Sequence, residues 1–191
     1  MLKRKLKKNI DLVLFLLFFG VIYAGGWQAE VFGLIQRGVL ATGLMEAERN
    51  HEFTAKTTEL NFQLYDSQGN TLHGQRLEGK TVFVNFWASW CPPCLAEMPG
   101  IQSLYEQVAN KEDIVFLMIS VDDEKDKARN FLARKSYDFP LYFPASVFPA
   151  GLQHQSIPAT YVISPEGKIV YQREGMASYD SQSFKEFLLQ L

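Results

Sequence analysis

Apolar and polar residues alternate along much of the chain in patterns that predict the strands of one α/β unit. Residues 60–65 alternate with a period of two, as expected of a half-buried strand, and a turn at 66–70 leads to a second candidate strand at 71–77. The run 114–121 is continuously apolar, which is typical of a strand buried on both faces. Further strands are expected at 81–86 and in a hairpin formed by 159–164 and 168–173.

Helical periodicity fills the intervals between these strands. From residue 92 to 108 one face is apolar; it carries Leu95, Met98, Ile101, Leu104, Tyr105 and Val108. Residues 122–136 predict a second helix, and Ser183-x-x-Glu186 is a capping box for a final one. Strands that alternate with helices in this way predict a layered α/β domain.

The N-terminal pattern differs from the rest and predicts a membrane segment. Residues 1–8 carry five positive charges, and 12–29 is an uncharged run of 18 residues that would span about 27 Å as a helix. The positive-inside rule places the basic end in the cytoplasm and the domain outside, with Trp27 as an interfacial aromatic residue. A signal peptide cleaved after the small residues 24–26 is the alternative. We expect a single-pass anchor in the cytoplasmic membrane and a periplasmic or extracytoplasmic domain.

The segment after this run has several interpretations. Residues 31–45 are apolar but contain three glycines and Arg37, and they could continue the anchor, lie along the membrane surface or pack on the domain as a helix. Residues 46–58 are polar and indicate a linker. The chain therefore divides into a basic tail and anchor at 1–30, a juxtamembrane segment and linker at 31–57, and a domain at 58–191.

Net charge argues against one class of function. The whole chain sums to −2, and because its first eight residues contribute +5, the remainder sums to −7. An acidic domain without a basic stripe is a poor partner for nucleic acid.

The chain has only two cysteines, Cys91 and Cys94, within the sequence Trp90-Cys-Pro-Pro-Cys94. A Cys-x-x-Cys pair between a strand and a helix is typical of a redox site. Cys91 would lie at the helix start, where free N–H groups and the helix dipole lower a thiol pKa, so we expect it to be the nucleophile and Cys94 the more buried resolving thiol. Pro92 and Pro93 suit the first helical turn and lack the N–H groups that could stabilise a thiolate further.

Two other uses of the cysteine pair remain open at this point. The first is half of a zinc site completed by His51, His73 or His154, none of which has ligand spacing to another, and the second is a purely structural disulfide. We expect no metal and no cofactor other than a redox-active Cys91–Cys94 disulfide. Asp122 and Asp123 resemble a metal pair only superficially and favour a solvated loop or a helix cap.

The segment from Val84 to Pro99 resembles the active-site segment of the thioredoxin superfamily. Its Glu97-x-Pro99 ending is similar to the TlpA/ResA-type membrane-anchored branch, and Ser156-Ile-Pro-Ala-Thr160 resembles the family's cis-proline loop. The resemblance covers about residues 58–191. It implies a thioredoxin-like fold, with a central mixed sheet flanked by helices, an N-terminal β extension and an insertion within 122–150.

The resemblance also implies roles for individual residues. The Ile157–Pro158 bond would be cis and would present the Ile157 backbone to a substrate strand, whereas an ordinary trans turn is the alternative. Glu97 would relay protons to Cys94 directly or through water, unless it is a solvated helix glutamate. Asn85 departs from many thioredoxins, which have a buried aspartate there, and it cannot titrate.

Trp90, next to Cys91, is expected to shield the disulfide and, with Pro92 and Pro93, to offer a surface to substrates. Trp87 is expected to belong to the core. Pro99 should kink the helix by removing the hydrogen bond to Leu95.

These observations favour a thiol–disulfide oxidoreductase that faces a compartment in which disulfides form. The resemblance implies that it reduces disulfides in exported proteins, with apocytochrome c as the best-known class of target, and that a thiol protein in the membrane supplies its electrons. A non-catalytic binding module with the same fold and a thiol peroxidase are the alternatives.

Overall fold

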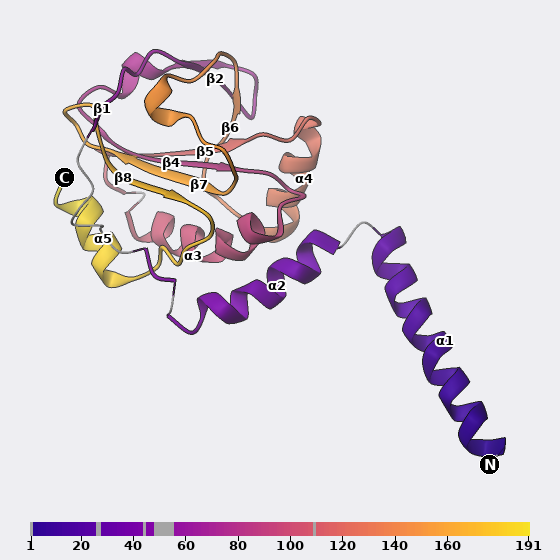
Figure 1. Ribbon diagram of the computed structural model, residues 1–191. Coiled ribbons are helices and arrows are strands. Elements are labelled where there is room, and N and C mark those ends of the chain that lie inside the picture. The colour runs from indigo at the N-terminus through magenta and orange to yellow at the C-terminus, as the bar shows by residue number, and fades with distance from the viewer. Residues whose placement is uncertain (1, 26–27, 44, 48–55, 109) are drawn as a thin grey trace.

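The computed structural model describes residues 2–25, 28–43, 45–47, 56–108 and 110–191. Within them the strands form one eight-stranded sheet in the order β1-β8-β7-β4-β5-β6-β2-β3 (Figure 1). Parallel pairing joins β4 to β5 and β5 to β6, and the other neighbours are antiparallel, so the expected mixed sheet is confirmed. The strands are β1 (Lys56–Thr57), β2 (Gln63–Asp66), β3 (Thr71–His73), β4 (Thr81–Trp87), β5 (Ile114–Ser120), β6 (Leu141–Pro144), β7 (Ala159–Ile163) and β8 (Lys168–Glu174).

The central strand β4 is buried along its whole length because β5 and β7 pair with its two edges and hydrophobic clusters cover its two faces. Side chains of a strand point alternately to opposite faces. Phe83 and Trp87 therefore belong to one cluster, whereas Val84 and Phe86 belong to the other. Asn85 lies on the Phe83 and Trp87 face, which positions it beneath the active-site helix.

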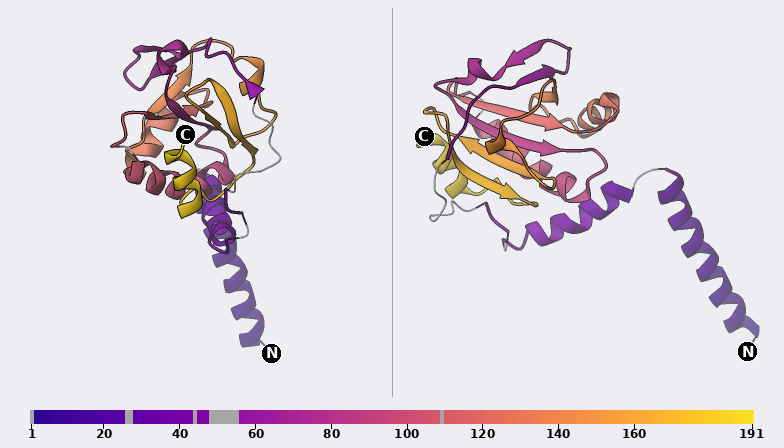
Figure 2. Two further views of the ribbon diagram at one scale, coloured as in Figure 1. Left: turned by 90° about the vertical axis from the view of Figure 1, so that its left-hand side faces the viewer. Right: turned by 45° about the horizontal axis from the view of Figure 1, so that its top comes forward.

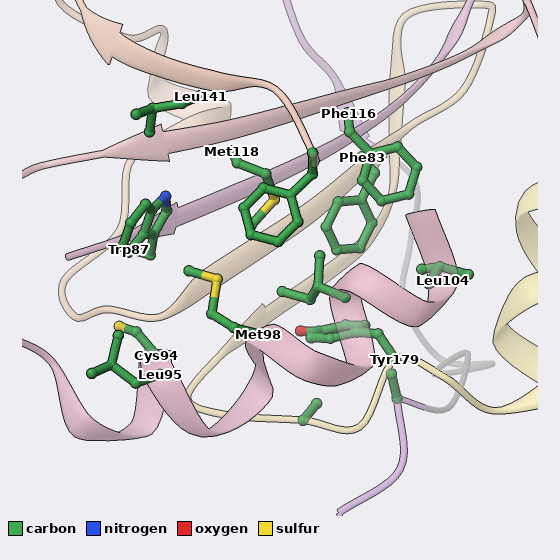
Figure 3. Packing of buried hydrophobic residues seen from close by; sticks show 14 of the residues in the cluster. Phe83, Trp87, Cys94, Leu95, Met98, Leu104, Phe116, Met118, Leu141 and Tyr179 are labelled. Carbon is green, nitrogen blue, oxygen red and sulfur yellow. The ribbon is translucent and has the colours of Figure 1, made fainter. Parts of the chain in front are cut away.

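Three α-helices contribute to the cluster on that face: α3 (Pro92–Val108), α4 (Lys125–Lys135) and α5 (Gln182–Leu189). Figure 3 shows Met98 projecting from α3 toward Met118 of β5 and Trp87 of β4. The opposite cluster includes residues of two short 3-10 helices, η1 (Gly74–Leu77) and η2 (Ala150–Leu152). Helix α4 and strand β6 fall within 122–150, where the insertion was expected.

Four predicted element boundaries are wrong. The first predicted strand, β2, begins at Gln63 instead of Leu60, because its pairing with β3 starts at Gln63. The second strand ends at His73 instead of Leu77, because the chain turns into η1 at Gly74, where a Cβ would clash with the Leu60 carbonyl oxygen. Helix α4 begins three residues later than expected, because Asp122 is held in hydrogen bonds to serines. The N-cap of α5 is Ser181, whose hydroxyl accepts from the Phe184 N–H, and the predicted box at Ser183 does not cap it.

Two helices precede the sheet: α1 (Leu2–Ala24) and α2 (Gln28–Leu40). Helix α2 lies along α3, and α1 leads away from the domain (Figures 1 and 2). Among the described residues no single helix is long and apolar enough to cross a bilayer, but Ile10–Ala24 and Gln28–Leu40 together meet that test, with a bend of 105° between them. Of the three interpretations of residues 31–45, packing on the domain is observed for α2. Trp27 lies outside the described residues.

The segment expected to be a linker is attached to the domain at both of its described ends. Ala47 is buried, and its N–H donates to the Ser178 carbonyl oxygen at 2.9 Å. Strand β1 pairs with β8, so the sheet begins two residues before the expected boundary at residue 58. Residues 48–55, including His51, are outside the described part of the chain.

Candidate functional site

The two cysteines lie where β4 passes into α3. Cys91 directly precedes the first residue of α3, Pro92, and Cys94 lies within the first helical turn. The two sulfur atoms form a disulfide 2.08 Å long. Strand, cysteine pair and helix therefore follow one another as the sequence predicts.

The position of Cys91 gives its sulfur the role of a helix N-cap acceptor. The Cys94 N–H donates to Cys91 Sγ at 3.3 Å, as an N-terminal N–H of a helix usually does to a capping oxygen. The same N–H and the positive end of the α3 dipole would stabilise a thiolate after reduction. Cys91 is 3% exposed and Cys94 is fully buried, so in the disulfide state the expected difference in burial is small.

The proline loop contacts the disulfide. The Ile157–Pro158 bond is cis, as the resemblance implied. The Ile157 carbonyl oxygen lies 3.8 Å from Cys91 Sγ, a van der Waals contact because a disulfide sulfur carries no proton to donate. The loop thus brings a backbone acceptor to the side of the disulfide, where a substrate strand could pair with it.

The remaining predicted substrate-binding residues surround Cys91. Trp90 is 59% exposed, whereas Pro92 and Pro93 are half-buried at the start of α3. Trp87 is fully buried and contributes to the core, as expected. An exposed indole beside a buried disulfide offers an apolar contact to an incoming protein, because exposed aromatic residues are common anchors in interfaces.

Glu97 lies under α3 and not on its solvated face. Only 1% of the residue is exposed, which excludes the solvated-glutamate alternative. Its Oε1 accepts from Asn85 Nδ2 at 2.7 Å, and its Oε2 accepts from the Ala177 N–H at 3.1 Å. Asn85 Nδ2 also donates to Thr160 Oγ1 at 2.9 Å, which links β4, α3 and β7 in one buried polar cluster.

Burial controls the protonation of this carboxyl group. Desolvation raises the pKa of Glu97 to about 8, and it outweighs the hydrogen bonds from Asn85 and Ala177 and the positive charge of Arg173, which all lower the pKa. Glu97 is three residues after Cys94 on the same helix, so the two side chains lie on neighbouring parts of one helix face. The site therefore combines a disulfide with a buried group that can exchange a proton near neutral pH.

Comparisons with known proteins agree with this geometry. Residues 52–186 match the Redoxin family. The chain belongs to the Redoxin family. Thiol-disulfide oxidoreductase ResA of Bacillus subtilis is 32% identical over 111 residues, 58% of this chain and 62% of that protein. ResA of Halalkalibacterium halodurans is 30% identical over 135 residues, 68% of this chain and 72% of that protein. The match to the B. subtilis protein thus spans less than two thirds of its length.

Solved structures support the same fold. The redoxin chain superposes on a thiol:disulfide interchange protein of the thioredoxin family from Chlorobium tepidum with a TM-score of 0.57 and 23% identity, covering 72% of this chain and 98% of that one. Together with the Redoxin match and the ResA relatives, this fold confirms the resemblance to the thioredoxin superfamily and its ResA-type branch.

Sequence reasoning missed the role of Asp122 in this redoxin. Asp122 is buried, and its carboxylate accepts from the Ser89 N–H at 2.9 Å, the Ser89 hydroxyl at 2.6 Å and the Ser120 hydroxyl at 2.8 Å. It is therefore neither a solvated loop residue nor a helix cap; it fixes the loop before Cys91. The available signal was its position two residues after the end of β5, because parallel β4 and β5 bring their carboxyl ends to the same edge of the sheet.

The zinc alternative finds no support in the described part of the chain. No group of three or more His, Cys, Asp or Glu side chains is arranged there to hold a metal ion. The His154 ring packs against Phe86, with centroids 4.3 Å apart.

Proposed function

We propose that the protein is a thiol–disulfide oxidoreductase in which Cys91 attacks and Cys94 resolves. The observation that carries the proposal is the Cys91–Cys94 disulfide at the start of α3, with Cys91 Sγ facing both a helical N–H and the Ile157 carbonyl oxygen. The similarity to the ResA proteins, which are named thiol-disulfide oxidoreductases, supports the same activity.

The reaction in the reducing direction transfers two electrons to a substrate. The Cys91 thiolate attacks one sulfur of a substrate disulfide, forms a mixed disulfide and expels the other sulfur as a thiolate. Cys94 then loses its proton and attacks Cys91 Sγ, which releases the second substrate sulfur and forms the Cys91–Cys94 disulfide. The substrate gains two electrons, and the enzyme dithiol is oxidised.

Glu97 would accept the proton that Cys94 loses in the second step. A pKa of about 8 means that this carboxyl group holds a proton at neutral pH when the cysteines are oxidised. That protonation state is the one expected directly after resolution, and proton return to Cys94 would accompany reduction of the disulfide. Asn85 and the Ala177 N–H would hold the carboxyl group in place.

The proposal also includes the direction of electron transfer, the location of the domain and the partners of the protein. Pro92 and Pro93 lack N–H groups that would stabilise the thiolate, and this favours a reductant over a strong oxidant. The basic residues 1–8 and the uncharged run 12–29 favour an anchor with the domain outside the cytoplasm. The substrates would be exported proteins with disulfides, apocytochrome c among them, and a membrane thiol protein would be the electron donor.

Trapping tests the proposal. In Cys94→Ala, expressed in its native membrane, the Cys91 mixed disulfide cannot be resolved, so discrete adducts should appear on non-reducing gels and be identifiable by mass spectrometry. Cys91→Ala/Cys94→Ala is the control and should give none. Absence of adducts from Cys94→Ala, with unchanged partner binding by the double variant, would instead favour the binding-module alternative.

A further inference from the structure

Helix α2 packs against the active-site helix α3 through a close contact at Gly33. A Cβ on Gly33 would lie 3.0 Å from the Pro92 carbonyl oxygen and 3.2 Å from Leu95 Cβ, closer than most side chains tolerate. One turn further along α2, Arg37 donates from its guanidinium to the Leu95 carbonyl oxygen at 3.2 Å. That oxygen has no helical donor, because Pro99 lacks an N–H. The contact therefore satisfies an acceptor that α3 cannot satisfy itself.

Both charged residues of α2 bind groups of the domain, on the side of the helix that faces α3 and α4. Besides Arg37, the helix contains only Glu30, whose carboxylate pairs with Arg134 at 2.8 Å and Lys135 at 2.7 Å at the end of α4. The domain thus holds α2 at both of its charged positions.

The outer side of α2 is apolar and has no partner within the described residues. Leu34 and Ile35 are 65% and 64% exposed, and no side chain on this side carries a charge. At 100° per residue the exposed positions fall on one continuous face, which we call the outer face of α2 and which consists of Val31, Phe32, Leu34, Ile35, Gly38 and Val39. Such a contiguous apolar patch is a sign of an interaction surface, unlike scattered single residues.

The chain itself indicates what covers this face. Only residues 25–27 separate α2 from α1, whose large apolar side chains are exposed from Ile10 to Tyr23. The bend between the two helices is 105°, so an α1 that crosses a bilayer along its normal leaves α2 within about 15° of the membrane plane. In Figures 1 and 2, α1 leaves α2 on the side away from the domain, which is the side of the outer face.

Basic side chains lie beside this face. Arg134 and Lys135 border α2, and together with their partner Glu30 they leave a net charge of +1 (two positive, one negative). Lys135 lines the same hollow as Val31 and Leu34 of the outer face. Basic groups next to an apolar helix face are typical of helices that lie in the interface of an anionic membrane.

We propose that the outer face of α2 lies in the lipid–water interface of the membrane that α1 crosses and so fixes the orientation of the redox domain. This inference rests on the anchor included in the proposed function. Gln28 and Phe32, near the α1 end of α2, line a hollow of about 540 Å³ together with Ser89, Trp90 and Pro92. The loop before Cys91, on the side of Ser89 and Trp90, is therefore held close to the membrane surface, within reach of a thiol protein embedded there.

Depth-dependent quenching in vesicles tests the proposal on the full chain. Cys91→Ala/Cys94→Ala supplies a cysteine-free background, and Ile35→Cys in it receives an environment-sensitive fluorophore. Val21→Cys, within α1, reports on the anchor. Val147→Cys, which is exposed on a loop on the far side of the sheet from α3, is the aqueous control. The proteins are reconstituted into equal mixtures of phosphatidylcholine and phosphatidylglycerol that contain spin-labelled lipids.

The proposal predicts loss of fluorescence at Ile35→Cys with a spin label near the headgroup, at Val21→Cys with a label on the upper acyl chains, and at Val147→Cys only with iodide. Strong iodide quenching at Ile35→Cys, with Val21→Cys still quenched by lipid, would overturn the proposal while the anchor stands. Shielding of Ile35→Cys from both iodide and lipid would overturn it in favour of a second copy of the chain. Loss of lipid quenching at both Ile35→Cys and Val21→Cys would contradict the anchor itself. Disulfide exchange, measured on the wild-type protein in the same vesicles, tests the activity independently.

Discussion

Replacement of Glu97 by glutamine should change how stability depends on pH. The pKa of Glu97 is raised from 4.5 to about 8, mainly by burial, so the folded protein keeps this proton over a range in which the unfolded chain has lost it. Because the folded state binds more protons between these two values, the free energy of unfolding falls as the pH rises through this window. The slope contributed by one such group is about 1.4 kcal/mol per pH unit.

The size of the expected change in the free energy of unfolding follows from the pH range between the unfolded and folded pKa values of Glu97. Over about 3.5 pH units the ionisation of Glu97 lowers the stability of the oxidised wild-type protein by about 5 kcal/mol, and about 3 kcal/mol of this is reached by pH 7. Glu97→Gln is neutral at every pH, and a half-turn of the Asn85 amide would let Asn85 Oδ1 accept from the new amide group. The variant should therefore become progressively more stable than the wild type as the pH rises from about 5 to about 8.

The assay is urea unfolding of the oxidised full chain in detergent, followed by tryptophan fluorescence at several pH values. Taking the difference between variant and wild type cancels the contributions of all other titrating groups. Glu106→Gln, on the exposed side of the same helix, is the matched control and should show no such trend. A difference between Glu97→Gln and wild type that stays constant across the pH range would refute the reasoning that burial controls this carboxyl group.

Three further outcomes follow from the packing around the site. Gly33→Leu should detach α2 from α3 and speed hydrogen exchange of the α2 amides. Gly38→Leu, where a Cβ meets nothing within 4 Å, is the control and should leave exchange unchanged. Equal exchange in both variants would contradict the close contact at Gly33. Met98→Ala removes a fully buried side chain and should lower the free energy of unfolding by about 2–5 kcal/mol in urea titrations, and a loss below about 1 kcal/mol would count against the core described above. Trp90→Ala should change the free energy of unfolding by less than about 0.5 kcal/mol. It should slow the reduction of a protein disulfide more than the reduction of a small-molecule disulfide. Equal slowing of both reactions would exclude a docking role for this indole.

Local signals in the sequence predicted the central part of the fold. Strand β4 and helix α3 lie within one residue of their expected bounds, because an apolar run, a cysteine pair at a helix start and a one-sided helical pattern are all encoded by near neighbours. The hairpin of β7 and β8 is confirmed for the same reason. The Ile157–Pro158 cis bond was expected only from the resemblance to thioredoxins, since no local pattern distinguishes it from a trans turn.

What the sequence could not predict depends on contacts between distant segments. Glu97 follows Ala96 and precedes Met98, and all three are buried because the sheet covers one side of α3 and α2 covers the other. The periodicity of α3 does not reveal that α2 packs on its other side. That packing depends on a single small residue, Gly33, in a helix far away in the chain. The hydrogen bonds of Asp122 to the loop before Cys91 likewise arise only when β5 pairs beside β4.

The most direct test of the exchange mechanism asks which sulfur attacks. Purified full-length Cys94→Ala and Cys91→Ala are each reduced and mixed with a peptide that contains one disulfide, and the intact masses are measured over time. The Cys91 sulfur, which the Cys94 N–H faces at the start of α3, should form the mixed disulfide rapidly, whereas Cys94 in the other variant should react slowly or not at all. Faster adduct formation at Cys94 than at Cys91 would contradict the assignment of nucleophile and resolving thiol.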